Sequence, residues 1–192
     1  MLSHNAQTIS AIPTLYAGIR FRSRLEAKWA AFFDFLDWPW TYEPDDLNGY
    51  IPDFVLHFYK PLLIEVKPAY SIAELYGYVH PIEQSKWQHE ALVVGVKPFP
   101  SDDNVHVIGI LGERPSGDFS TDWQWAWGSG LLFGCYNCLH ASIRHEHMSW
   151  HCRRSGCLEA HKHIGYPAFP GGVDAVWARA CNIVQWRGGN RQ

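Results

Sequence analysis

The sequence predicts an α/β fold with a small cysteine-rich module near its C-terminal end. Three observations lead to this prediction. A segment with helical periodicity precedes two short apolar segments that are rich in residues favouring buried strands. A continuous apolar segment follows a second predicted helix, as expected of a buried parallel strand. Four of the five cysteines then fall within one short stretch, a pattern more typical of metal binding than of a disulfide framework.

The first predicted helix spans about residues 24–36, after an arm of about fifteen residues. Its apolar residues recur at helical spacing and form one face, and they are Leu25, Trp29, Phe32, Phe33 and Leu36. The segment from Asp37 to Pro39 ends it. We expect this face to pack against the body of the protein.

The remaining elements follow from strand-favouring runs and from turn residues. Strands are expected at about 40–43, 52–58, 62–67, 91–96 and 105–111, with a turn at 45–50 that contains Asn48-Gly49. Helices are expected from Pro81 to His89 or Glu90 and at about 173–185. Because the composition shifts to Trp, Gly, Cys and His, we predict two parts, residues 1–122 and 123–192.

Two acids and a lysine lie at the ends of two neighbouring predicted strands. Asp53 opens the first strand, while Glu65 and Lys67 share one face of the second. A buried strand rarely carries Glu and Lys on one face unless they are paired or functional. Carboxylate oxygens suit Mg²⁺, so the trio predicts a divalent cation site beside an ammonium group. An ordinary Glu65–Lys67 ion pair on a half-exposed strand is the alternative.

Pro52-Asp53, eleven further residues and then Glu65-Val66-Lys67 resemble the motif of the PD-(D/E)xK nuclease superfamily, the restriction-endonuclease-like fold. Residues 22–30 resemble the first helix of phage and bacterial members, and Tyr42-Glu43-Pro44 resembles the strand that leads into the core. The resemblance covers about residues 16–98. It implies a mixed central sheet flanked by helices, with the element order α-β-β-β-α-β.

The resemblance also implies roles for the trio. Asp53 and Glu65 would bind Mg²⁺ or Mn²⁺, and the backbone carbonyl of Val66 would add a ligand. Lys67 would position the attacking water and help to neutralise the scissile phosphate. No covalent intermediate is implied.

Two further residues are candidates on the same grounds. In many relatives a glutamate on the first helix reaches the metal site, which would be Glu26 here. However, Ser23-Arg24-Leu25-Glu26 is also a capping box, and the two roles compete for one carboxylate. Lys86, after the second strand, is a candidate for phosphate contact, with a solvated helix face as the alternative.

The cysteines form one C-x₂-C pair and one C-x₄-C pair, which together resemble a zinc ribbon. They are Cys135 and Cys138, then Cys152 and Cys157. Four thiolates in tetrahedral geometry select Zn²⁺ and stabilise a module too small to bury its own core. Free buried thiols, or a histidine that replaces one cysteine, are the alternatives. Cys181 stands apart and is expected to be a free buried thiol.

Basic residues on this module are candidates for contact with nucleic acid, against the alternative of a solvated basic surface. They are Arg144, Arg153 and Arg154. The net charge of −3 neither supports nor excludes a nucleic-acid partner, because local basic patches can differ from the mean. A protein partner at the ribbon is equally open.

Together these features predict a metal-dependent nuclease that hydrolyses phosphodiester bonds, with DNA as the expected substrate and a zinc ribbon that aids substrate or partner binding. One alternative is a non-cutting binding or inhibitor protein in host–phage conflict. Another is a nuclease subunit of a larger DNA-processing or transposition complex.

No apolar stretch is long enough to cross a membrane, and the N-terminus carries no secretion signal. We therefore expect a cytoplasmic protein of a bacterial host cell, and a homodimer is left open.

Overall fold

The computed structural model describes residues 11–44, 46–85, 87–100, 106–113, 125–147, 152–157, 165–166 and 172–185. The first half contains β1 (Thr14–Tyr16), β2 (Ile19–Phe21), α1 (Arg24–Phe35), β3 (Trp40–Tyr42), β4 (Phe54–Leu56), β5 (Leu62–Val66), α2 (Ile72–Leu75), the 3-10 turn η1 (Tyr76–Tyr78) and α3 (His80–Gln84). The second half contains β6 (Ala91–Phe99), β7 (His106–Glu113), β8 (Ala126–Cys135), β9 (Ala141–His145), β10 (Gly165–Tyr166) and α4 (Gly172–Ile183).

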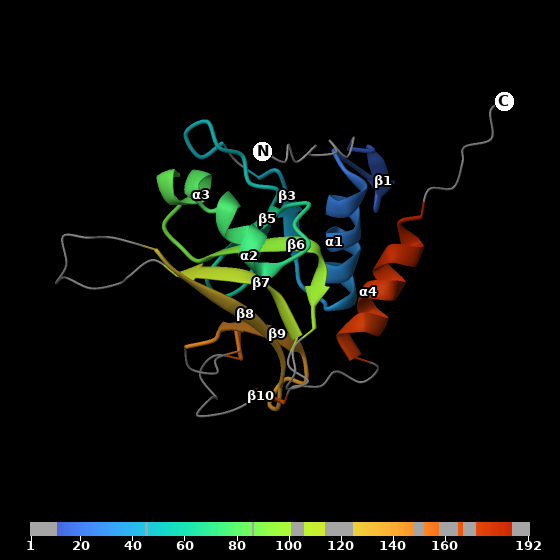
Figure 1. The fold of residues 1–192 in the computed structure, drawn as a ribbon. Coiled ribbons are helices and arrows are strands. Elements are labelled where there is room, and N and C mark those ends of the chain that lie inside the picture. Colours follow the sequence, from blue (N-terminus) through green and yellow to red (C-terminus); the bar gives the residue numbers. More distant parts are fainter. Residues whose placement is uncertain are drawn as a thin grey trace, which may run out of the picture.

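Eight strands form one mixed sheet in the order β10-β8-β7-β6-β5-β4-β3, with β9 paired to β8. The pair β5 and β6 is parallel, as the apolar run at 91–96 predicted, and the other paired strands of this sheet are antiparallel. Strands β3, β4 and β5 form a meander, and the segment with α2 and α3 connects β5 to its parallel neighbour. The predicted α/β class with a mixed sheet flanked by helices is confirmed (Figure 1).

The sheet separates two apolar layers. Residues of β5 alternate between them: Leu62, Ile64 and Val66 pack in the layer of α1 and α4. Leu63 packs in the opposite layer with buried residues of α2 and α3. The same alternation puts the Glu65 side chain on the face of Leu63, which is the face covered by α2 and α3.

Trp29 of α1 is the anchor of the first layer. Its side chain is fully buried, and its Nε1–H donates to the carbonyl of Gly95 in β6 at 2.8 Å. The ring also contacts Trp177 of α4 with a centroid distance of 4.8 Å, and the two helices lie side by side (Figure 1). The predicted helix at 24–36 is confirmed, and its apolar face is what joins the start of the chain to the sheet.

The second predicted helix, from Pro81 to His89 or Glu90, is wrong in its length. The helix α3 ends at Gln84, because Ser85 leaves the helical conformation and its hydroxyl donates to the Ile82 carbonyl at 2.7 Å. The Trp87 indole then donates to the carbonyl of Glu90 at 2.9 Å, which fixes an irregular approach to β6. The helix α2 was missed, although Ser71-Ile72-Ala73-Glu74 is a capping-box sequence.

The sheet continues past residue 122. Strand β8 lies beyond the predicted division and pairs with β7 over most of its length. Arg153, from the cysteine-rich segment, also pairs with Glu90 at the start of β6, with its Nη2 at 3.0 Å from Oε1. The division into residues 1–122 and 123–192 stays a prediction about independent folding, and any such boundary has to cross one continuous sheet.

We predict that replacing Trp29 with alanine destabilises the protein by about 3 to 5 kcal/mol, the usual range for deleting a large buried aromatic ring. Replacing Trp29 with phenylalanine keeps most of the ring and removes the hydrogen bond to Gly95, so a loss of about 1 kcal/mol is expected. Urea denaturation of both variants provides the measurement. Equal stability of wild type and the alanine variant would contradict the role of Trp29 as an anchor.

Candidate functional site: a buried carboxylate cluster and four cysteines

The register of β4 and β5 brings the predicted acids together. Phe54 opposes Ile64 in this antiparallel pair, so the register continued by one residue places Asp53 opposite Glu65. Both residues are buried, with exposed fractions of 3% for the whole of Asp53 and 6% for the whole of Glu65. Asp53 Oδ2 accepts a hydrogen bond from the backbone N–H of Val66 at 2.7 Å. Asp53, directly before β4, is thus hydrogen-bonded to the residue that follows Glu65 in β5.

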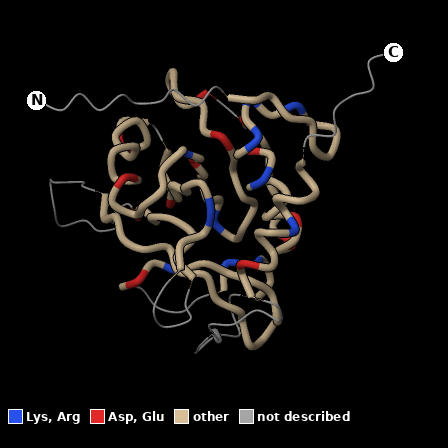
Figure 2. The backbone as a smooth tube through the Cα atoms, turned by 45° about the vertical axis from the view of Figure 1, so that its right-hand side comes forward, with Lys and Arg blue, Asp and Glu red and all other residues tan. Residues whose placement is uncertain are grey.

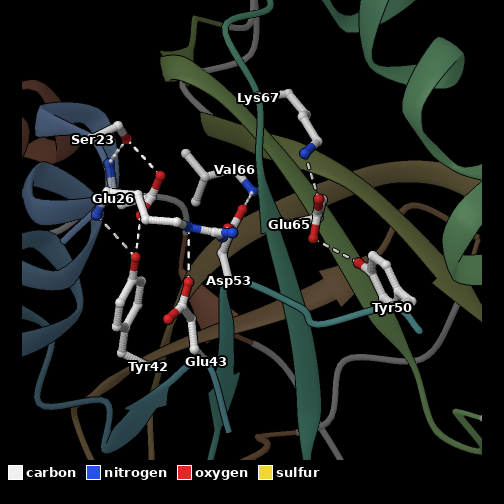
Figure 3. Close-up of polar contacts among 10 residues, drawn as sticks. Ser23, Glu26, Tyr42, Glu43, Tyr50, Asp53, Glu65, Val66 and Lys67 are labelled. Carbon is white, nitrogen blue, oxygen red and sulfur yellow. Dashed lines mark hydrogen bonds and ion pairs between the residues drawn. The ribbon is translucent and has the colours of Figure 1, made fainter. Parts of the chain in front are cut away.

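Glu65 is held from two directions, as Figure 3 shows. Its Oε2 accepts a hydrogen bond from the Tyr50 hydroxyl at 2.6 Å, and its Oε1 forms an ion pair with Lys67 Nζ. Tyr50 reaches this position because the predicted Asn48-Gly49 turn precedes it, with positive φ at both residues. The Lys67 ammonium also lies 5.9 Å from the centre of the Tyr78 ring. The Glu65–Lys67 ion pair, which was the alternative to a metal site, is therefore present, but it lies within a buried acidic cluster.

Glu26 is the third buried acid, with an exposed fraction of 7%. The Ser23 hydroxyl accepts from the Glu26 backbone N–H at 3.1 Å, so the predicted N-terminal cap of α1 is present. The carboxylate accepts from the Ser23 and Tyr42 hydroxyls at 2.7 and 2.6 Å. Both oxygens of Glu26 are therefore engaged by hydroxyl groups, and the cap and the carboxylate cluster share one side chain.

Arg22 joins the acids on the helix side. Its guanidinium lies 2.5 Å from Asp53 Oδ1 through Nη2, 2.8 Å from Glu43 Oε1 through Nε, and 3.9 Å from Glu26 Oε2 through Nε. The sequence alone predicted no role for Arg22. The acids are contacted by residues 15 to 31 positions away in the sequence, namely Tyr42, Tyr50 and Arg22. Patterns within a short stretch of sequence cannot predict such contacts.

Burial and the negative charge of Glu65 raise the pKa of Asp53 to about 7. The Val66 N–H and the Lys67 ammonium act in the opposite direction without cancelling the shift. Burial and the neighbouring Glu65 carboxylate likewise raise the pKa of the Tyr50 hydroxyl, which stays protonated as a donor. The cluster therefore carries negative charge that the protein's own groups offset only in part.

The four cysteines form the second candidate site. Cys135 and Cys138 bracket the turn between β8 and β9, and the Cys152–Cys157 turn is closed by Gly156 with a φ of +80°. Their four sulfur atoms all lie within 4.8 Å of one another, so they could hold a metal ion such as zinc. Among the described residues this is the one group of three or more Cys, His, Asp or Glu ligands that gathers so closely. The carboxylates of Glu26, Asp53 and Glu65 do not form such a group.

The cysteine geometry fits a tetrahedral thiolate site. The Sγ atoms of Cys135 and Cys157, and those of Cys138 and Cys152, are 3.7 Å apart. A tetrahedron with Zn–S bonds of about 2.3 Å has edges of about 3.8 Å. Burial alone would raise the pKa of the Cys135 thiol, but N–H groups of Cys138 and Asn137 donate to its sulfur and lower that pKa below the ordinary value. The described histidines do not join the group, whereas His151, His161 and His163 lie outside the described residues.

The predicted phosphate-contact residues differ in their surroundings. Arg153 is partly buried, with a side-chain exposed fraction of 14%. It donates from Nε to the Ile143 carbonyl at 2.7 Å and pairs with Glu90, and loss of solvent lowers its pKa to about 10. Arg154 is partly exposed and pairs with Asp37 at 2.7 Å. Arg144 donates to the Glu146 carbonyl at 3.3 Å. Lys86 lies outside the described residues. Contact with nucleic acid stays a prediction for all four.

No family model matches the sequence, and no curated protein and no solved structure resembles it significantly. In the part of the chain that the structure describes, no helix is both long and apolar enough to cross a membrane.

We predict a pH dependence of stability that comes from Asp53. Between its ordinary pKa of 3.8 and its folded value of about 7, the folded protein keeps a proton that the unfolded chain has released. The free energy of unfolding should therefore fall as the pH rises through this window. The Asp53→Asn variant lacks this titration, so its stability should fall less steeply between about pH 5 and pH 8. Urea denaturation without added divalent cations measures both slopes, and parallel slopes would contradict the shift.

We also predict that the purified protein contains about one equivalent of zinc, held by the four cysteines. Plasma mass spectrometry of wild type and of the Cys152→Ser variant measures it, and the variant should lose the metal and melt at a lower temperature. Cys181→Ser is the matched control, because Cys181 lies on α4 away from the cluster, and it should keep the zinc. Equal zinc content in the two variants would refute the assignment.

Proposed function

We propose that this chain is a metal-dependent nuclease that hydrolyses phosphodiester bonds, with DNA as the expected substrate. One observation carries the proposal: two buried carboxylates and an ammonium group meet where an antiparallel strand pair adjoins a parallel strand. The element order α1, β3, β4, β5, helical segment, β6 is the order expected of a restriction-endonuclease-like core, and it supports the proposal. Buried acids whose charge the protein offsets only in part favour a site completed by a cation.

The donor set fits a hard divalent ion, either Mg²⁺ or Mn²⁺. Asp53 and Glu65 would hold it, with the Val66 carbonyl as a backbone ligand, and oxygen ligands are what these ions prefer. When bound, such an ion supplies a water of lowered pKa and offsets charge on the phosphate. Glu26 lies on the Asp53 side of the cluster, where its negative charge contributes to the raised pKa of Asp53.

The chain's own groups orient the reaction. Tyr50 fixes the Glu65 carboxylate, and the Val66 N–H fixes that of Asp53, so neither acid can turn away from the strand ends. The Lys67 ammonium is partly exposed, with a side-chain exposed fraction of 28%, whereas its partner Glu65 is buried. Lys67 would therefore direct a proton-donating group toward the scissile phosphate and the attacking water.

The four cysteines would form the core of a zinc ribbon that aids substrate or partner binding. Arg154 and Arg144 lie on this module, whereas the partly buried ion pair of Arg153 and Glu90 serves to fix the module to β6. Figure 2 shows basic and acidic residues interspersed along the described backbone, with no long run of one sign. This pattern supports a partner bound through a few placed contacts more than through a broad basic surface.

A second candidate function is a binding protein that does not cut. Each acid of the opposed pair already has a cation of the protein beside it, Arg22 for Asp53 and Lys67 for Glu65, and this pairing favours the alternative. A nuclease subunit that is active only within a larger complex would behave in the same way when isolated.

We predict that supercoiled plasmid or a labelled oligonucleotide is cleaved in the presence of Mg²⁺ or Mn²⁺ and not in EDTA. Asp53→Ala, Glu65→Ala and Lys67→Ala should each lower the rate at least about a hundredfold, because each removes a charge from the reacting centre. Lys60→Ala is the matched control for Lys67, since Lys60 lies in the exposed turn between β4 and β5. Tight binding of DNA without cleavage under either metal would favour the binding protein instead.

A further inference from the structure

Asp53 has both carboxylate oxygens engaged, and by different kinds of group. Oδ2 accepts the N–H of Val66, a backbone group within the sheet that cannot leave without disturbing β5. Oδ1 faces Nη2 of Arg22 at 2.5 Å. Of the two partners, only Arg22 belongs to a flexible side chain, so the Oδ1 side is where a ligand can be exchanged.

The exposure of this ion pair is strongly unequal. The exposed fraction of the Arg22 side chain is 56%, whereas that of the Asp53 side chain is 4%. The arginine can therefore rotate into water and stay solvated, while the aspartate stays buried and would be left without a counter-ion. A buried carboxylate that loses one cation is stabilised again by another cation or by a proton.

The guanidinium also serves more than one acid. Its Nε lies 2.8 Å from Glu43 and 3.9 Å from Glu26, in addition to the contact of Nη2 with Asp53. One positive charge is thus placed among three carboxylates, two of them buried. A divalent cation at Asp53 would repel this charge at close range, because two cations a few ångströms apart at a low-dielectric site interact strongly.

We propose that Arg22 is a displaceable counter-ion, which occupies the carboxylate cluster in the metal-free protein and is expelled when a divalent cation binds at Asp53. This inference rests on the proposed function, since it concerns the same metal site. The released guanidinium is then available for a phosphate of the nucleic-acid strand, the planar anion that arginine binds best. Arg22 lowers the metal affinity of the empty site and makes metal and phosphate binding mutually favourable.

The direction in which Arg22→Gln changes the affinity for the metal separates this role from a structural one. If Arg22 only kept the acids in place, Arg22→Gln would weaken metal binding. If Arg22 competes with the metal, Arg22→Gln should tighten binding by about tenfold, within the usual range of coupling between two sites. Titration of the protein with Mn²⁺, followed by the electron paramagnetic resonance signal of the free ion, gives the dissociation constant directly and needs no cleavage.

Two further variants make the result specific. Arg20→Gln removes the same charge two residues away, at an exposed position of β2, so it controls for long-range electrostatics and should leave the dissociation constant within about twofold of wild type. Asp53→Asn should abolish the site. The protein is prepared without chelator, so that any metal at the four cysteines stays bound.

The outcomes are distinct. Tighter Mn²⁺ binding in Arg22→Gln than in Arg20→Gln supports the counter-ion role, and equal or weaker binding overturns it while the metal site itself stands. If wild type binds no more Mn²⁺ than Asp53→Asn, the proposed metal site fails and takes the counter-ion role with it.

A measurement on the wild-type protein guards against misfolding of the variant. In protein labelled with ¹⁵N-arginine, the Nε–H resonance that Arg22→Gln removes identifies Arg22. We expect Mg²⁺ to shift this resonance toward the position of a solvated arginine. An unchanged Arg22 resonance at Mg²⁺ concentrations that saturate the site would overturn the proposal.

Discussion

The hydrogen bond from the Val66 backbone to Asp53 is the interaction on which the rest of the site depends. It joins the start of β4 to the end of β5, and it exists only in the register that pairs Phe54 with Ile64. A slip of one residue would turn Glu65 to the opposite face of the sheet and bring an apolar side chain in its place. The burial of Leu62, Ile64 and Val66 under α1 fixes that register, so the hydrophobic layer on one face sets the position of Glu65 on the other.

Much of this arrangement could be predicted from local sequence. The helical spacing of apolar residues from Leu25 to Leu36 gave the first helix, and the Asn48-Gly49 turn gave the reversal that precedes the site. Alternation along 62–67 put Glu65 and Lys67 on one face, where the structure pairs them. The cysteine spacing predicted the four-sulfur group, because two short-spaced cysteine pairs are typical of a zinc site. The structure brings the two pairs together, with Cys135 beside Cys157 and Cys138 beside Cys152.

Other features could not be predicted from short stretches of the sequence, because they depend on contacts between distant segments. The hydroxyls of Tyr42 and Tyr50 and the guanidinium of Arg22 become partners of the acids only through the pairing of β3 with β4 and the packing of α1. The helix expected through Glu90 stops at Gln84, and beyond it Glu90 pairs with Arg153 while its carbonyl accepts a hydrogen bond from the Trp87 indole. Tertiary contacts there outweigh the helical preference of the segment.

The two candidate centres differ in how completely the protein supplies their ligands. Four sulfurs already lie at the spacing of a tetrahedral site, whereas each acid is paired with a cation of the protein and Arg22 would have to move for a metal ion to bind. The most direct test of the acidic centre is anomalous diffraction from crystals soaked in Mn²⁺. We expect a manganese peak bounded by the carboxylates of Asp53 and Glu65, with Arg22 turned away. Manganese density that is absent from these carboxylates at saturating Mn²⁺ would contradict it.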